Sequence, residues 1–125
     1  MEQFITRLDV QFSENYWIFL IPMFLMLIDF ATGIIHAWAT GHLKSFKMRE
    51  GLSKKAGELS ILAIGEIFTV GMSIPIYVLT FLSIYIIIME IISICENLKK
   101  MGIRIPKFID KALEDMDNEI QKGGK

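Results

Sequence analysis

The sequence predicts an all-α integral membrane protein with three transmembrane helices, the N-terminus outside and the C-terminus in the cytoplasm. Three observations support this prediction: two long apolar blocks, small residues and a proline that divide the second block, and lysines gathered outside both. The chain has 125 residues, of which 53% are hydrophobic, and its formal net charge is -1. This length suits one structural unit.

The first apolar block runs from Tyr16 to Ala39, with Asp29 as its only formal charge. A membrane span needs about 20 such residues, so we expect a span at about 16–39. The end of the block resembles a signal-peptide cleavage site, Ala37-Trp38-Ala39. However, the run is too long for the apolar region of a signal peptide, and Asp29 interrupts it. We therefore expect this span to be retained.

The second apolar block runs from Ile61 to Cys95 and carries only two charges, Glu66 and Glu90. As one helix it would be about 52 Å long, well beyond the roughly 30 Å of a hydrocarbon core. Helix-breaking residues occur near its centre: Gly71, Ser73 and Pro75. We therefore expect two spans, at about 56–74 and 76–95. One kinked helix with a re-entrant or interfacial portion is the alternative.

Basic residues orient these spans. Residues 1–15 contain only Arg7, whereas the connector at 40–58 contains five basic residues: Lys44, Lys47, Arg49, Lys54 and Lys55. The positive-inside rule places this connector in the cytoplasm. The charged tail at 96–125 is also rich in lysine, so three spans satisfy both assignments. We thus divide the chain into a membrane domain, 1–95, and a cytoplasmic tail, 96–125.

The two cytoplasmic segments are expected to be amphipathic. The connector mixes its basic residues with apolar ones and is either a helix lying on the anionic inner leaflet or a solvated loop. After Pro106 the tail has apolar residues at helical spacing: Ile109, Leu113, Met116 and Ile120. This pattern predicts a short C-terminal amphipathic helix.

Each predicted span carries one carboxylate on a polar face. In the first span Asp29, Gly33 and His36 lie on one side of the helix. Glu66 and Glu90 occupy similar faces in the other two spans. Charged residues in a span usually face a bundle interior or a water-filled cavity. Either Asp29, His36, Glu66 and Glu90 line an aqueous lumen between several copies, or each carboxyl is protonated and bonds to a neighbouring helix.

A series of small residues runs along the first span: Gly33, Ala37 and Gly41. Residues of this kind at a four-residue spacing let helix backbones approach closely within lipid. The series predicts close helix packing, and self-association into a homo-oligomer is its most specific interpretation.

Several classes of function are disfavoured. The sequence has no enzyme signature such as G-x-S-x-G, H-E-x-x-H or a P-loop, so we expect no enzyme activity and no cofactor. Cys95 is the single cysteine, and His36 and His42 fall on different helix faces, so no metal site is predicted. A net charge near zero without a basic stripe makes nucleic acid an improbable partner.

Two ordered sets of residues resemble a known family, over about residues 25 to 115. The first set is Asp29-Phe-Ala-Thr-Gly33, Ala37, Gly41-His-Leu-Lys-Ser45, Gly51 and Lys54-Lys55. The second set is Met89-Glu90, Ser93-Ile94, Glu96-Asn97, Gly102, Ile105-Pro106-Lys107 and Leu113. In order and spacing both resemble the phage holins grouped with clostridial toxin-secretion holins. Glu66 stands where that family would have an aspartate.

The resemblance implies a protein that accumulates in the host cytoplasmic membrane, oligomerises there and forms lesions for an endolysin or a toxin. Two other functions are compatible with the residues themselves. A small ion-coupled transporter or channel subunit would use the membrane carboxylates as proton sites. An accessory membrane scaffold would recruit a partner through its tail.

Overall fold

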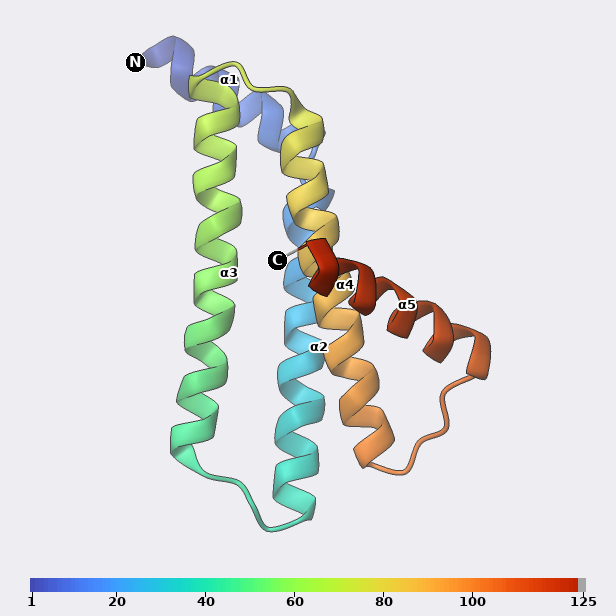
Figure 1. Ribbon diagram of the computed structural model, residues 1–125. Helices are drawn as coiled ribbons and strands as arrows, with labels where there is room; N and C mark the ends of the chain where they lie inside the picture. The colour runs from blue at the N-terminus through green and yellow to red at the C-terminus, as the bar shows by residue number, and fades with distance from the viewer. Residues whose placement is uncertain (124–125) are drawn as a thin grey trace.

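The computed structural model describes residues 1–123, and within them all regular secondary structure is helical. Side chains at 117, 120, 121 and 123 lie outside the description, so the apolar role predicted for Ile120 is not described. Figure 1 shows the five helices: α1 (Glu2–Glu14), α2 (Trp17–Ala39), α3 (Ser45–Gly71), α4 (Ile76–Lys100) and α5 (Lys107–Gly123).

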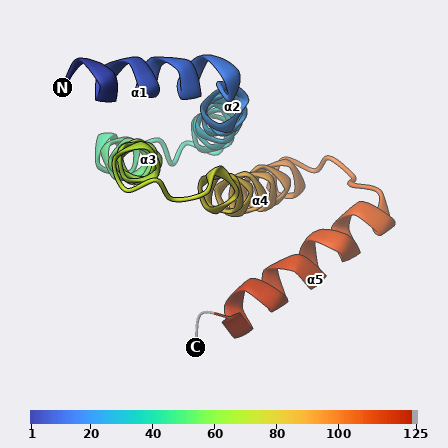
Figure 2. The ribbon, with the colours of Figure 1, turned by 90° about the horizontal axis from the view of Figure 1, so that it is seen from above.

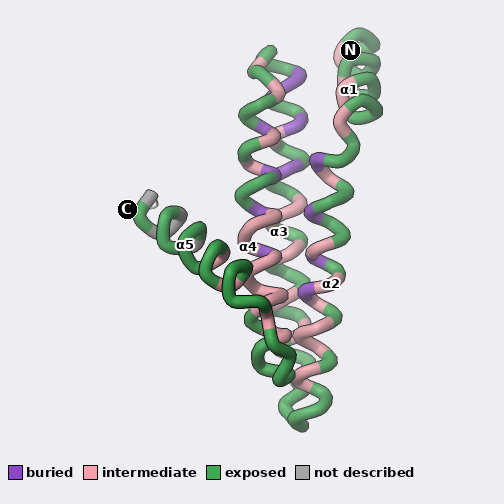
Figure 3. The backbone as a smooth tube through the Cα atoms, turned by 90° about the vertical axis from the view of Figure 1, so that its right-hand side faces the viewer, coloured by how far each residue is buried: buried purple, intermediate pink, exposed green. Residues whose placement is uncertain are grey.

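The helices α2, α3 and α4 form a bundle. α2 and α4 run in the same direction, and α3 runs back between their ends in the opposite direction (Figure 1). Seen from above, the three helices stand close together, with α1 lying across one end (Figure 2). Their facing sides carry the buried residues (Figure 3). The apolar core comprises Ile18, Met26, Leu62, Leu79 and Ile86.

Two of the described helices, α2 and α4, are long and apolar enough to cross a membrane, with mean hydropathies of 2.3 and 2.4. Large apolar side chains cover their outer faces, among them Phe24, Leu27 and Phe81. Trp17 and Trp38 lie exposed near the two ends of α2, about 32 Å apart along the helix. Indole rings favour membrane interfaces, so this spacing suits one hydrocarbon core.

The predicted break in the second apolar block is confirmed, and the single kinked helix is excluded. α3 ends at Gly71 and α4 begins at Ile76, with Pro75 as its N-cap residue. Ser73 has a positive φ of 54°, which turns the chain between the helices. Proline fits the start of α4 because the first turn of a helix lacks partners for its N–H groups.

The connector is helical, so the solvated loop is wrong, and its helix is continuous with the following apolar segment. α3 starts at Ser45, so the segment from Ser45 to Glu58 is the first half of a long helix. Only residues 40–44 form the link after α2. Good helix formers dominate this half, and it packs along α2, where Phe30 approaches Gly51. α4 likewise continues beyond Cys95, to Lys100.

An amphipathic helix, α1, was not expected from the sequence. Arg7 donates hydrogen bonds to the carbonyl oxygen of Val70 (2.7 Å) and to Ser73 Oγ (3.4 Å). A cation at this position complements the negative end of the α3 dipole. Phe4 packs against Gly71 at the same place. α1 therefore covers the end of the bundle where α3 turns into α4.

The predicted C-terminal amphipathic helix is present as α5, which follows Pro106. Its first turns contact α4, where Lys99 forms an ion pair with Asp110, and the rest of the helix extends away from the bundle (Figure 2). Leu113 is half-buried, while Ile109 and Met116 are exposed. α5 is thus attached to α4 at its start and leaves much of its surface uncovered (Figure 3).

α3 packs closely against α4 at Gly65, and this contact predicts that a larger residue at position 65 destabilises the bundle. A Cβ at Gly65 would lie 2.9 Å from Leu79 Cδ1, whereas nothing lies within 4 Å of a Cβ at Gly57. Gly65→Leu should therefore overpack the core, at a cost of about 1–3 kcal/mol. Gly57→Leu, which gains the same helix propensity, is the matched control. Thermal unfolding in mild detergent should show a lower midpoint for Gly65→Leu only; equal midpoints would contradict the packing.

Candidate functional site: a buried triad between three helices

Three charged side chains meet inside the bundle, one from each long helix. Lys55 Nζ on α3 lies 2.7 Å from Asp29 Oδ2 on α2 and 2.7 Å from Glu90 Oε2 on α4. We call Asp29, Lys55 and Glu90 the buried triad. Their side chains are 9%, 13% and 2% exposed. Asp29 falls near the middle of α2, so the triad lies far from both ends of the bundle.

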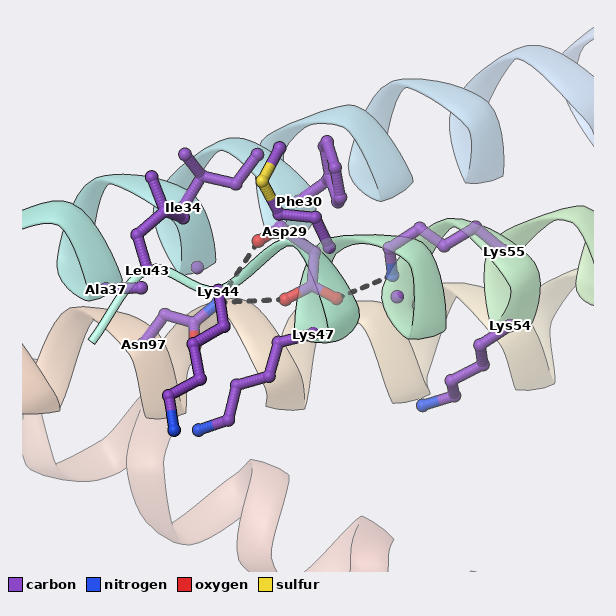
Figure 4. Close-up of a pocket in the computed structure, with 13 residues that line it drawn as sticks. Asp29, Phe30, Ile34, Ala37, Leu43, Lys44, Lys47, Lys54, Lys55 and Asn97 are labelled. Carbon is purple, nitrogen blue, oxygen red and sulfur yellow. Dashed lines mark hydrogen bonds and ion pairs between the residues drawn. The ribbon is translucent and has the colours of Figure 1, made fainter.

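Neutral donors complete the coordination of Asp29. Ser93 Oγ donates to Asp29 Oδ1 at 2.6 Å, and Asn97 Nδ2 donates to the same oxygen at 3.0 Å. Asn97 Nδ2 also lies 3.0 Å from Thr32 Oγ1 and 3.2 Å from the Asp29 carbonyl oxygen. Figure 4 shows Asn97 and Lys55 approaching Asp29 from opposite sides. Ser93 and Asn97 lie one turn apart, so one face of α4 supplies both donors.

Acid outnumbers base at this site. If all three groups of the buried triad are ionised, its formal charge is -1. The carboxyl group of Glu58 lies beside Glu90, and one of its oxygens is buried without a hydrogen-bond partner among the described residues. An interior of low polarity screens charges weakly. Lys55 therefore attracts both Asp29 and Glu90 and holds the three helices together, while the neighbouring carboxylates still repel each other.

Lys55 does not lie where the sequence predicts. Its place in the connector groups it with the membrane-surface residues Lys44, Lys47, Arg49 and Lys54, but its ammonium group lies in the interior of the bundle. The physical reason is the helical extension of α3, which carries position 55 to the level of Asp29. A buried carboxylate needs a cationic partner, and the last lysine before the second apolar block was the available signal.

The third carboxylate occupies a separate place. Glu66 accepts a hydrogen bond from Gln11 Nε2 (2.8 Å), and its other oxygen is buried without a described partner. Ser83 Oγ, also buried, donates to the Ile18 carbonyl oxygen at 2.7 Å. His36 is half-buried and no hydrogen bond joins it to Asp29 in the described residues. The structure therefore joins Asp29 with Glu90 and leaves Glu66 and His36 apart.

The three members of the small-residue series have different roles. Gly33 faces Asn97, whose Nδ2 would lie 3.6 Å from an added Cβ, so it serves packing within the chain. Gly41 follows the end of α2 with a φ of +73° and has no atom near an added Cβ. It ends the helix, where a left-handed conformation favours glycine. Ala37 lines the cavity between α2 and α3.

This arrangement links α2, α3 and α4 through charged and polar side chains. Within the described residues, no group of three His, Cys, Asp or Glu side chains is placed to hold a metal ion.

Comparison with known proteins gives a consistent picture. A family model described as the bacteriophage holin family matches residues 8–118. An uncharacterized protein of Halalkalibacterium halodurans is 28% identical over 120 residues, which cover 90% of this chain and 89% of that protein. The uncharacterized protein YqxH of Bacillus subtilis is 31% identical over 99 residues, covering 78% of this chain and 70% of YqxH. No solved structure matches the chain.

Proposed function

Because the chain belongs to the bacteriophage holin family, we propose that it assembles into homo-oligomers in the bacterial cytoplasmic membrane and opens lesions there. An endolysin, or a toxin, would cross the membrane through these lesions. The observation that carries this proposal is a polar face on α3 that lies beside two apolar helices.

We propose that all three long helices cross the bilayer. α2 and α4 are the apolar ones, and they run in the same direction (Figure 1). A chain that crosses twice in one direction must return between the two crossings, and α3 is the segment that connects them. The bundle therefore favours three spans, even though α3 is less apolar than its neighbours.

The lysines favour an orientation with the N-terminus outside and the tail inside. The link between α2 and α3 and the end of α4 lie at the same end of the bundle (Figure 1). Basic residues cluster at this end, including Lys44, Lys47 and Lys100, whereas α1 at the other end contains only Arg7. The positive-inside rule assigns the lysine-rich end to the cytoplasm.

The face of α3 that points away from the bundle is unsuited to lipid in its first half. Exposed residues at helical spacing form what we call the polar strip: Glu50, Ser53, Lys54, Gly57 and Ser60. Lys54 directly precedes Lys55, which pairs with Asp29 near the middle of α2, so the strip reaches the depth of the apolar spans. A charged side chain at that depth costs roughly 3 kcal/mol when it faces lipid.

Self-assembly removes this cost. When several copies pack side by side with their polar strips facing a shared lumen, the apolar faces of α2 and α4 keep their contact with lipid. Water in the lumen hydrates Lys54 and Glu50. The buried triad fixes the rotation of α3 and thereby directs the strip outward. Carboxylates of the triad reach the lumen only when α3 separates from α2 and α4, which enlarges the lesion.

Controlled expression in bacteria tests this proposal. Induction should dissipate the membrane potential and, when an endolysin is produced in the same cells, cause rapid lysis. A variant with Lys54→Leu and Glu50→Leu should insert but delay or abolish lysis, because its strip then prefers lipid. The matched control places the same substitutions on α5, at Lys111 and Glu114. Cells that stay energised at high expression, or strip and control variants that behave alike, would contradict it.

A further inference from the structure

A cavity of about 300 Å³ lies between α2 and the first half of α3, next to the buried triad. Its volume is at the lower end of the range for small-molecule sites. One wall is apolar and includes Phe30, Ile34 and Leu43. Lysines line the remainder: Lys44, Lys47, Lys54 and Lys55. A site with both an apolar wall and several ammonium groups suits an amphiphilic anion.

Three of these lysines are available to a ligand. Lys55 is committed to Asp29 and Glu90, but no ion pair within the described residues involves Lys44, Lys47 or Lys54. Figure 4 shows these three side chains extending to the same side, away from Ile34 and Leu43. Like charges gathered around one cavity repel each other unless an anion lies between them.

The position of the cavity favours one source for that anion. It extends from Asp29, in the middle of α2, to Lys44, at the end of the bundle where α2 turns into α3. A phospholipid has the same succession of parts, with a phosphate at the membrane surface and acyl chains toward the centre. Gly51 keeps this path open, since its missing side chain would face Phe30 at 3.7 Å.

We propose that this cavity binds one anionic phospholipid, with its phosphate between Lys44 and Lys47 at the membrane surface and the start of an acyl chain along Ile34 and Phe30. This is a defined site, distinct from a diffuse attraction of the basic segment to the leaflet, and it does not depend on lesion formation. A lipid in this position would contact both α2 and α3 and support their packing.

Binding can be measured by native mass spectrometry of the full chain in a neutral detergent, with phosphatidylglycerol or phosphatidylcholine added. We expect one phosphatidylglycerol per chain to bind in preference to phosphatidylcholine. The double variant Lys44→Gln, Lys47→Gln should weaken phosphatidylglycerol binding at least about tenfold, since each lysine near an anionic headgroup contributes a factor of about five. The matched control carries Lys111→Gln and Lys122→Gln on α5, which remove the same charge elsewhere.

A second variant tests the apolar wall without changing charge. Gly51→Leu should fill the path of the acyl chain and weaken phosphatidylglycerol binding, with circular dichroism confirming the helical fold. Soluble glycerol 3-phosphate should fail to displace the lipid. Equal binding of both phospholipids, or equal losses in the double variant and its control, would overturn the proposal. Displacement by glycerol 3-phosphate would also overturn it, because the site would then recognise a free phosphate.

Discussion

Replacing Lys55 with methionine is expected to destabilise the folded bundle by about 3–5 kcal/mol, which is the usual cost of removing one partner from a buried ion pair. The variant leaves two carboxylates, Asp29 and Glu90, facing each other at the centre of the bundle without a cation. Most of the cost comes from these uncompensated charges, because methionine fills a volume similar to that of the lysine stem.

Two matched variants distinguish lost charge balance from lost packing. Lys54→Met removes a lysine from the neighbouring, exposed position and should leave stability nearly unchanged. The triple variant Lys55→Met, Asp29→Asn, Glu90→Gln removes all three charges and should recover much of the loss. Thermal unfolding in mild detergent gives the comparison. If Lys55→Met and Lys54→Met unfold at the same temperature, the triad does not stabilise the bundle.

Glu90→Gln is expected to have the opposite effect and to delay lysis. It removes one negative charge from a site where acid exceeds base, and its amide oxygen can still accept from Lys55. Glu58, which lies beside position 90, also loses a like-charged neighbour. The closed bundle becomes more stable, so separation of α3 from α2 and α4 is rarer. We expect the unfolding midpoint to rise by a few degrees, for a gain of roughly 1 kcal/mol.

The delay is measured as the time from induction to loss of membrane potential in cells with equal amounts of protein. Glu96→Gln is the control, because Glu96 lies on the same helix but is exposed. An unchanged onset for Glu90→Gln, together with a raised unfolding midpoint, would show that opening of the triad does not limit lesion formation.

The sequence predicts the apolar helices well because their signal is local. The bounds of α2 and the break before Ile76 follow from runs of apolar residues and from Pro75, without reference to the rest of the chain. The extent of α3 was underestimated because its first half is polar, and hydropathy assigns such a segment to the surface. Packing against α2 and pairing of Lys55 override that preference.

The buried triad shows that contacts between helices cannot be predicted from the residue pattern of single helices. Helical spacing correctly identifies Asp29 and Glu90 as polar positions in apolar helices, but it treats the three carboxylates as equivalent. Only the tertiary arrangement shows that Lys55 joins Asp29 to Glu90, whereas Glu66 bonds to Gln11 on α1. Pairing depends on the depth of each residue along antiparallel helices, which the sequence of one helix does not encode.

Release from liposomes tests the central claim most directly. The purified full-length chain is reconstituted into vesicles of bacterial lipid that contain both a small dye and a folded protein the size of an endolysin. If lesions form, both the dye and the folded protein leave the vesicles. The release of both should rise steeply with protein density, as self-assembly requires. Release of the dye or of protons alone, with the folded protein retained at every density, would contradict the account and favour a selective channel.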